Sequence, residues 1–199
     1  YAEGFELKMD LAFSNFRAGL SMMRHRAVAS TAPGMLAYEN DTSALLGVFD
    51  DPNKAILARG STYFDRGTMG RIWAVHSPIR GIQSSVIISY QDGLPYSRYL
   101  PVKGFNQGVF GILTRRRGPG DAECSGGFRT VHYRNIDLRI AKEFPWGAGR
   151  MSALVDIFNL ENRGQALLQT EVTAPTHLWR MPLRFQTPRS IQLGLRYSW

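Results

Sequence analysis

The sequence holds a single cysteine and no long hydrophobic run. One cysteine, Cys124, can form neither an internal disulfide nor a zinc site built from several cysteines. The longest uninterrupted apolar patches, such as residues 86–88, contain three or four residues, whereas a helix that spans a membrane needs about 20. A disulfide-stapled domain and a helical membrane protein are therefore excluded.

The N-terminus has no initiator methionine and none of the basic and apolar segments that form a signal peptide. We therefore expect the chain to be a fragment or a processed product. Its 199 residues, 44% hydrophobic and 20% charged, suit one domain.

An excess of basic residues gives the chain a formal charge of +8, which suggests nucleic acid or an anionic surface as a partner. The basic residues are scattered singly, however. The one run, residues 115–117, lies among glycines and prolines without the interleaved aromatic residues that bind single strands. We expect no nucleic-acid partner. In an external loop the run could meet anionic lipopolysaccharide or an acidic substrate, although a solvated charge run is the simpler interpretation.

Apolar and polar residues alternate along much of the chain, with the period of two that places successive side chains of a strand on opposite faces. In the C-terminal segment, Ile191, Leu193 and Leu195 alternate with polar residues and glycine without an exception. The pattern predicts an all-β, antiparallel fold of about seven strands, at about residues 5–13, 17–26, 67–76, 82–92, 129–144, 150–158 and 189–199.

The face of the third predicted strand is ambiguous. Ile72 and Ala74 compete with Met69, Trp73 and Val75 for the apolar face, so the alternation alone does not orient this strand.

The connections between these strands alternate in length. Short links are predicted at about 14–16, 77–81 and 145–149, and long loops at about 28–66, 93–127 and 160–188, with a helical turn near 43–48. Bacterial outer-membrane barrels have short turns in the periplasm and long loops outside. The order therefore predicts part of a transmembrane β-barrel with its C-terminus in the periplasm.

A soluble antiparallel sandwich is the competing interpretation, since it also alternates apolar and polar residues. Loops longer than about 15 residues are uncommon in compact soluble domains. Seven strands cannot close a single-chain barrel with an even strand count, so we expect missing strands beside the first and the last. Aromatic residues near the strand ends fit the two girdles of a membrane barrel: Phe5, Phe13, Tyr90, Phe144, Trp146, Tyr197 and Trp199.

Residues 135–147, 153–162 and 188–199 resemble the C-terminal end of TonB-dependent receptors, most of all those with a carboxypeptidase-regulatory-like domain. The specific parts are the Asp-x-Phe-Asn-Leu-x-Asn element at 156–162 and the terminal aromatic residue. The resemblance covers about residues 129–199, and more weakly 5–27 and 64–99.

The resemblance implies that residues 1–199 are the C-terminal part of a barrel of about 22 strands in the bacterial outer membrane. It also implies a plug domain outside this chain and uptake of a scarce nutrient driven by the TonB energy-coupling complex. Tyr197 and Trp199 are implied to signal to the barrel-assembly machinery, with Trp199 where Phe is more usual. Outer-membrane lipid, lipopolysaccharide and the rest of the barrel are the other implied partners. The alternatives are a non-transporting barrel with adhesive or surface-assembly loops, and a passive porin.

Charged residues in the predicted strands are expected to face the barrel interior. Asp156 lies between Val155 and Ile157, so it points inward if these apolar neighbours face lipid, and we expect it to form hydrogen bonds in the wall or to the plug. Asp137 and Arg139 are similar candidates.

No residue pattern indicates catalysis, a metal or a cofactor. A nucleophilic site could be imagined from Cys124, His132 and Asp137, but no nucleophile motif surrounds them, and no glycine-rich loop opens a helix. We therefore expect no enzyme. The four histidines are isolated, without the spacing of a metal site: His25, His76, His132 and His177.

Overall fold

The computed structural model describes residues 2–30, 59–61, 65–79, 81–96, 99–105, 108–113, 128–169 and 181–199. All regular structure in these ranges is β-strand, and no helix among them is long and apolar enough to cross a membrane. The seven long strands are β1 (Ala2–Ala12), β2 (Phe16–Ser30), β4 (Thr68–Ile79), β5 (Ile82–Gln91), β10 (Tyr133–Trp146), β11 (Gly149–Phe158) and β14 (Ser190–Ser198).

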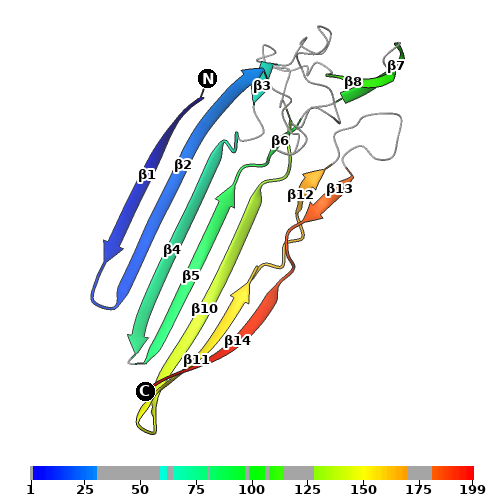
Figure 1. Ribbon diagram of the computed structural model, residues 1–199. Coiled ribbons are helices and arrows are strands. Elements are labelled where there is room, and N and C mark those ends of the chain that lie inside the picture. Colours follow the sequence, from blue (N-terminus) through cyan, green and yellow to red (C-terminus); the bar gives the residue numbers. More distant parts are fainter. Residues whose placement is uncertain are drawn as a thin grey trace.

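These strands form one antiparallel sheet in the order β1-β2-β4-β5-β10-β11-β14, which is also their order along the chain. Figure 1 shows them side by side in a single layer. The predicted all-β fold with seven antiparallel strands is confirmed. Within the described residues the sheet is open, with β1 and β14 as its two edges.

The predicted long loops are wrong in part, because they contain short strands. Those of two to four residues are too short to show alternation, and they are paired by hydrogen bonds to a partner strand. The end of β2 extends to Ser30 and pairs with β3 (Arg59–Ser61). The predicted helical turn near 43–48 lies outside the described residues. The other short pairs are β6 (Pro95–Tyr96) with β9 (Phe128–Arg129), β7 (Tyr99–Phe105) with β8 (Gly108–Leu113), and β12 (Ala166–Gln169) with β13 (Pro182–Phe185).

All three short links lie at one end of the sheet, here called the turn end, and the C-terminus lies beside them (Figure 1). The links follow Ala12, Ile79 and Trp146. Gly81 and Gly147 have φ angles of 80° and 58°, a left-handed conformation that glycine adopts without strain. The longer connections all leave the opposite end, here called the loop end.

One face of the sheet is mainly apolar. Directly opposed residues of an antiparallel pair share a face, so the register assigns each side chain to a face. A row of directly opposed residues crosses five strands as Met9, Leu20, Ile72, Ile88 and Ile136. A second row crosses β5, β10, β11 and β14 as Val86, Leu138, Ile157 and Ile191.

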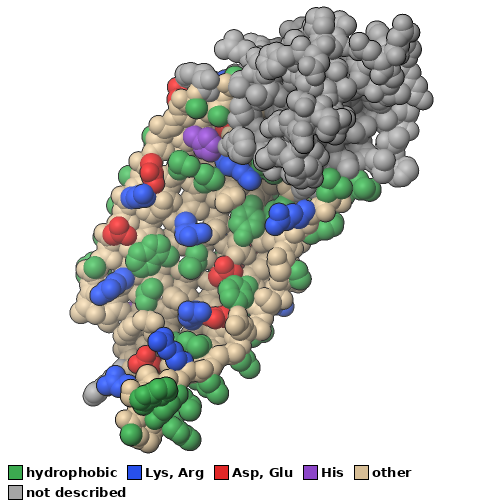
Figure 2. Space-filling view, viewed as in Figure 1, with side chains coloured by type: hydrophobic (Ala, Val, Ile, Leu, Met, Phe, Trp, Pro, Cys, Tyr) green, Lys and Arg blue, Asp and Glu red, His purple; other side chains and the backbone are tan. Residues whose placement is uncertain are grey.

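The opposite face is mainly polar. Figure 2 looks onto it and shows side chains of both charges scattered over the sheet. One of its rows of directly opposed residues is polar across all five strands: Lys8, Ser21, Arg71, Ser89 and Asn135.

The register also orients the ambiguous strand β4. Ile72 lies on the apolar face, whereas Trp73 lies on the polar face opposite Gly19. A Cβ atom at position 19 would collide with the Trp73 Nε1, so the indole covers the glycine. Glycine at this position therefore makes room for a large ring on the polar face.

The sheet has almost no hydrophobic core of its own. Val28 and Leu94 are the buried hydrophobic residues in the described part of the chain. On the apolar face, in contrast, Leu193 is 76% exposed and Leu195 75% exposed. Burial of one such side chain is worth about 1.5–3 kcal/mol, so apolar surroundings against this face would stabilise the sheet.

Candidate functional site

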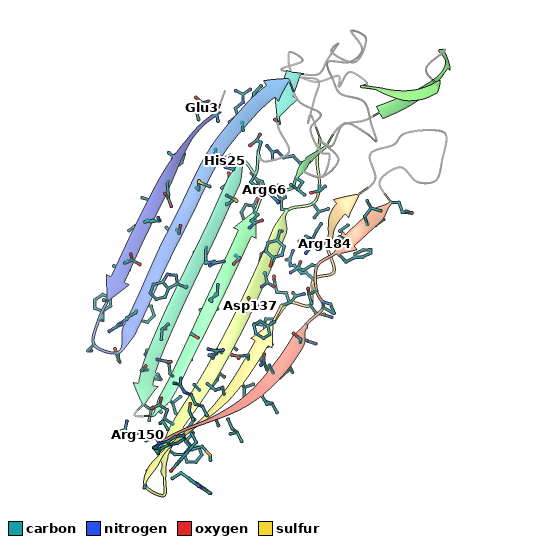
Figure 3. The ribbon with its side chains drawn as sticks, viewed as in Figure 1. Glu3, His25, Arg66, Asp137, Arg150 and Arg184 are labelled. Atoms are coloured by element: carbon teal, nitrogen blue, oxygen red, sulfur yellow. The ribbon has the colours of Figure 1, made fainter. Side chains whose placement is uncertain are left out.

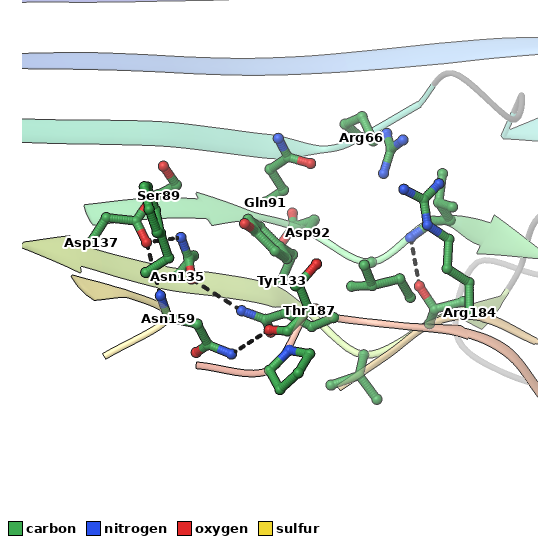
Figure 4. Close-up of a pocket in the computed structure, with 18 of the residues that line it drawn as sticks. Arg66, Ser89, Gln91, Asp92, Tyr133, Asn135, Asp137, Asn159, Arg184 and Thr187 are labelled. Atoms are coloured by element: carbon green, nitrogen blue, oxygen red, sulfur yellow. Dashed lines mark hydrogen bonds between the residues drawn. The ribbon is translucent and has the colours of Figure 1, made fainter. Parts of the chain in front are cut away.

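A cavity of about 660 Å³ lies on the polar face at the loop end of the sheet (Figure 4). Its floor is formed by side chains of three neighbouring strands, β4, β5 and β10, which alternation directs to this face. Its rim is formed by the ends of β11 and β13 and by the links that leave the sheet. The lining residues used below are Arg66, Arg71, Ser89, Gln91, Asp92, Leu94, Tyr133, Asn135, Asp137, Phe158, Asn159, Arg184 and Gln186.

Asp137 organises the inner end of the cavity. Its Oδ1 accepts hydrogen bonds from the Asn135 Nδ2 at 2.8 Å and from the backbone N–H of Asn159 at 2.9 Å. The Gln186 Nε2 donates to the Asn135 Oδ1 at 3.3 Å and to the Arg134 carbonyl at 3.1 Å. These bonds fix the side chains that line the cavity and join β10 to two segments that are distant in the sequence.

The Asp-x-Phe-Asn-Leu-x-Asn element forms the turn by which the chain leaves β11. Asn159 and Asn162 have φ angles of 51° and 53°, a left-handed conformation that asparagine tolerates better than most residues. The Asn159 Nδ2 donates to the Thr187 carbonyl at 2.8 Å, and the Asn162 Oδ1 accepts from the Arg189 N–H at 3.0 Å. Both asparagines therefore hold the segment that enters β14.

The first residue of this element, Asp156, lies on the polar face and pairs with Arg139. The Arg139 Nη2 donates to the Asp156 Oδ2 at 2.8 Å, between directly opposed residues of β10 and β11. The side chain of Asp156 thus forms its hydrogen bonds within the wall of the sheet.

An ion pair between a buried aspartate and a partly exposed arginine joins three links at the loop end. The side chain of Asp65 is 2% exposed, and its Oδ2 lies 2.8 Å from the Arg129 Nη2. The Arg129 Nη1 also donates to the carbonyls of Asp65 at 2.8 Å and Gly93 at 3.0 Å, while the Gly67 N–H donates to the Asp65 Oδ1 at 3.0 Å. The chain ends that enter β4, leave β5 and enter β10 are therefore held together at one point.

Asp92 forms a second junction, at the end of β5. Its carboxylate accepts hydrogen bonds from the Thr68 N–H at 2.8 Å and from the Tyr90 hydroxyl at 2.7 Å, and it lies 3.1 Å from the His132 Nδ1. Partial burial alone would raise the pKa of Asp92. The two hydrogen bonds and the nearby His132 and Arg129 outweigh that effect, so the pKa lies below its ordinary value of 3.8.

The substitution Asp92→Asn is expected to lower the free energy of unfolding by about 1–3 kcal/mol at pH 7 and by less at pH 3. Because folding depresses the pKa of Asp92, its carboxylate contributes fully above the ordinary value of 3.8, and this contribution is lost as the pH falls through the folded-state value. The measurement is the guanidinium unfolding midpoint of both proteins at the two pH values. If the midpoints of the two proteins differ by the same amount at pH 7 and at pH 3, the lowered pKa of Asp92 is contradicted.

Three arginines line the cavity: Arg66, just before β4; Arg71, in β4; and Arg184, in β13. Figure 4 shows Arg66 and Arg184 at the same end of the cavity. Among the described residues none of the three forms an ion pair. Among the described lining residues the cavity thus holds three arginines against two carboxylates, Asp92 and Asp137, and neither carboxylate forms an ion pair with them.

Most residues singled out from the sequence do not contribute to the cavity. Tyr197 and Trp199 lie at the turn end, with ring centroids 6.1 Å apart. His132 is bound to Tyr90 and Asp92, apart from Asp137, so the imagined nucleophilic site does not form with these two residues. Cys124, His177 and residues 115–117 lie outside the described ranges. No group of three or more His, Cys, Asp or Glu residues that could hold a metal occurs in the described part.

No known family model matches this chain, and no curated protein is significantly similar to it. The chemistry that the cavity can perform follows from its own lining. Guanidinium, amide, hydroxyl and two carboxylate groups surround it, with Leu94 and Phe158 among its apolar members. Such a lining suits the noncovalent binding of a polar ligand that carries negative charge.

The arginines and the Asp65–Arg129 pair were not predicted from the sequence. Each is a single charged residue in or beside a loop, and the residues that face it are distant along the chain. The asparagines at 159 and 162 did carry a signal, since left-handed turns favour this residue type.

Proposed function

We propose that this chain is part of the wall of a bacterial outer-membrane β-barrel that takes up a scarce nutrient by energy-coupled transport. The outer-membrane location, the larger barrel of about 22 strands and the plug belong to the same proposal. No enzymatic step is part of it.

The observation that carries the proposal is the division of the sheet into one apolar and one polar face. On the apolar side of β10, Arg134 and Lys142 lie eight residues apart with apolar residues between them. At ~3.4 Å per residue this spacing is about 27 Å along the strand. A tilt of about 40° reduces it to about 20 Å across the membrane, close to the ~25 Å apolar band of outer-membrane barrels.

The positions of the links support an orientation in the membrane. Short turns and the C-terminus share one end, as on the periplasmic side of such barrels, and long connections share the other. Two charged residues of the apolar face, Arg24 and Arg134, lie at its loop end, where anionic lipopolysaccharide headgroups would lie. The two open edges would pair with further strands of the same barrel, because unpaired backbone groups are costly in lipid.

A cavity on the polar face favours uptake over adhesion. The polar face would line the barrel interior, so a ligand bound there lies on a path through the membrane, whereas an adhesin would use surfaces outside the barrel. The plug would close this path, and the TonB complex would supply the energy to open it.

Growth under nutrient limitation tests the proposal. Deletion of the gene is expected to slow growth on at least one limiting nutrient, and removal of the energy-coupling complex should reproduce the defect. Uptake that persists without the coupling complex would indicate a passive porin. Unchanged growth on all nutrients with reduced surface attachment would indicate an adhesin and would overturn the proposal.

The terminal residue offers a separate prediction about assembly. The substitution Trp199→Ala is expected to reduce the amount of folded protein in the outer membrane several-fold, because the barrel-assembly machinery would lose its terminal aromatic signal. Trp199→Phe should restore it. Trp146→Ala is the matched control, since Trp146 is an exposed aromatic residue at the same end of the sheet. Folded protein is quantified by gel mobility without heating, and equal losses in the two alanine variants would contradict the prediction.

A further inference from the structure

We propose that the cavity at the loop end binds a hydroxyl-rich organic anion, whose carboxylate or phosphate group is held by Arg66, Arg71 and Arg184. This inference rests on the proposed function in so far as it names the class of ligand that would be transported. The binding site itself is argued from the described residues alone.

The first argument is the charge of the cavity. Elsewhere on the sheet, Arg129, Arg134 and Arg139 each pair with a carboxylate. The three cavity arginines form no ion pair among the described residues. Figure 3 shows Arg66 and Arg184 on different segments near the loop end, and both residues line the cavity. Like charges at one end of a cavity repel one another, and an oxyanion bound between Arg66 and Arg184 would reduce this repulsion.

The second argument is that the carboxylates in the cavity are already occupied. Asp92 accepts hydrogen bonds from Thr68 and Tyr90. Asp137 accepts hydrogen bonds from Asn135 and Asn159. Both oxygens of Asp92 and the Oδ1 of Asp137 are therefore bound to the protein, and the arginine, amide and hydroxyl groups of the lining supply donors to a ligand.

The third argument concerns the rest of the lining. Ser89, Gln91 and Tyr133 come from the adjacent strands β5 and β10 and lie beside the cavity in Figure 4. Their hydroxyl and amide groups can both donate to and accept from ligand hydroxyls. Leu94 and Phe158 supply apolar surface for a carbon ring. The volume of about 660 Å³ matches a small organic molecule rather than a bare ion.

The position of the site excludes a lipid headgroup as the ligand. Arg71 belongs to the polar face, directly opposite Ser21 and Ser89. Lipid would contact the other face of the sheet, so the ligand comes from the aqueous side of the wall.

Calorimetric titration of the purified protein in a neutral detergent tests the site with four probes: glucuronate, glucose 6-phosphate, glucose and inorganic phosphate. We expect the two sugar anions to bind at least about tenfold more tightly than glucose, since charge-assisted hydrogen bonds to arginine are lost with the neutral sugar. Binding of inorganic phosphate as tight as that of the sugar phosphate would support the arginine site but identify the free ion as the ligand, which overturns the organic part of the proposal. Equal binding of glucose and the sugar anions, or no binding of any probe, would overturn the site.

Variants connect the binding to the named residues. Arg71→Gln and Arg184→Gln are each expected to weaken binding of the tightest anion by about tenfold or more. Arg150→Gln is the matched control, because Arg150 lies at the turn end in Figure 3, on the polar face opposite Ser198. Equal weakening in Arg150→Gln would show that net charge rather than the cavity binds the anion. Binding needs no energy source, so a result here is independent of whether the protein transports.

Discussion

The substitution Arg129→Met is expected to lower the free energy of unfolding by about 3–5 kcal/mol. Methionine keeps an unbranched apolar side chain but removes the guanidinium group that donates to Asp65, whose side chain is 2% exposed. The carboxylate would then be left in the interior with only the Gly67 N–H as a partner. The cost is large because an unpaired buried charge loses its hydration without compensation. Guanidinium unfolding of the protein folded into lipid vesicles measures it.

Two control variants separate this effect from a general loss of charge. Lys8→Met breaks the exposed Lys8–Glu6 pair, whose side chains are 67% and 51% exposed, and should change stability by less than about 1 kcal/mol. The double variant Asp65→Leu with Arg129→Met should be more stable than Arg129→Met alone, because no orphaned charge remains. A double variant that is less stable than the single one would show that the hydrogen bonds of Arg129 to the carbonyls, not the ion pair, dominate.

The sheet could be predicted from the sequence because its information is local. Alternation within one strand, as at Leu193 and Leu195, is visible without knowledge of any neighbour. It located all seven long strands and separated the short links from the long connections. Asp156 could be placed on the polar face for the same reason, since its neighbours Val155 and Ile157 define the other face.

The cavity could not be predicted from the sequence, because its lining residues come from segments that are far apart along the chain. Arg71 and Arg184 become neighbours of one cavity only after strands far apart in the sequence take their places. The face of β4 is a similar case, since apolar residues occupy both of its sides. It was decided by the register with β2, in which Gly19 leaves space for Trp73 and Leu20 meets Ile72. Short strands such as β3 were missed because three residues cannot show a period.

The stability of the rim and the charge of the cavity are physically connected. The Asp65–Arg129 pair holds the chain immediately before Arg66. The hydrogen bond between Gln186 and the Arg134 carbonyl holds the segment that follows Arg184. These contacts therefore help to keep the guanidinium groups of Arg66 and Arg184 at the same end of the cavity. Loss of the Asp65–Arg129 ion pair should weaken anion binding and also lower the free energy of unfolding.

The substitution Leu193→Arg is expected to destabilise the protein in a lipid bilayer by about 2–4 kcal/mol, the cost of an arginine near the midplane on the lipid face of a barrel. Leu193 lies directly opposite Val155, which lies opposite Ile140, in the middle of the apolar face. In water the same change would be nearly neutral, because Leu193 is 76% exposed on the isolated sheet. The effect therefore measures what surrounds this face. Reversible unfolding in vesicles gives the free energy, and gel mobility without heating gives the folded fraction.

Gln192→Arg is the matched control for this substitution, since it adds the same side chain one residue earlier on the same strand. Gln192 lies opposite Asp156 on the polar face, where an added arginine meets water and a nearby carboxylate. We expect a change within about 0.5 kcal/mol. A large loss for Leu193→Arg and none for Gln192→Arg can arise only if lipid, or an equally apolar partner, covers one face alone. Similar small effects in both variants would mean that the apolar face meets water in the native protein, and the membrane proposal would then fail while the anion site on the other face could still stand.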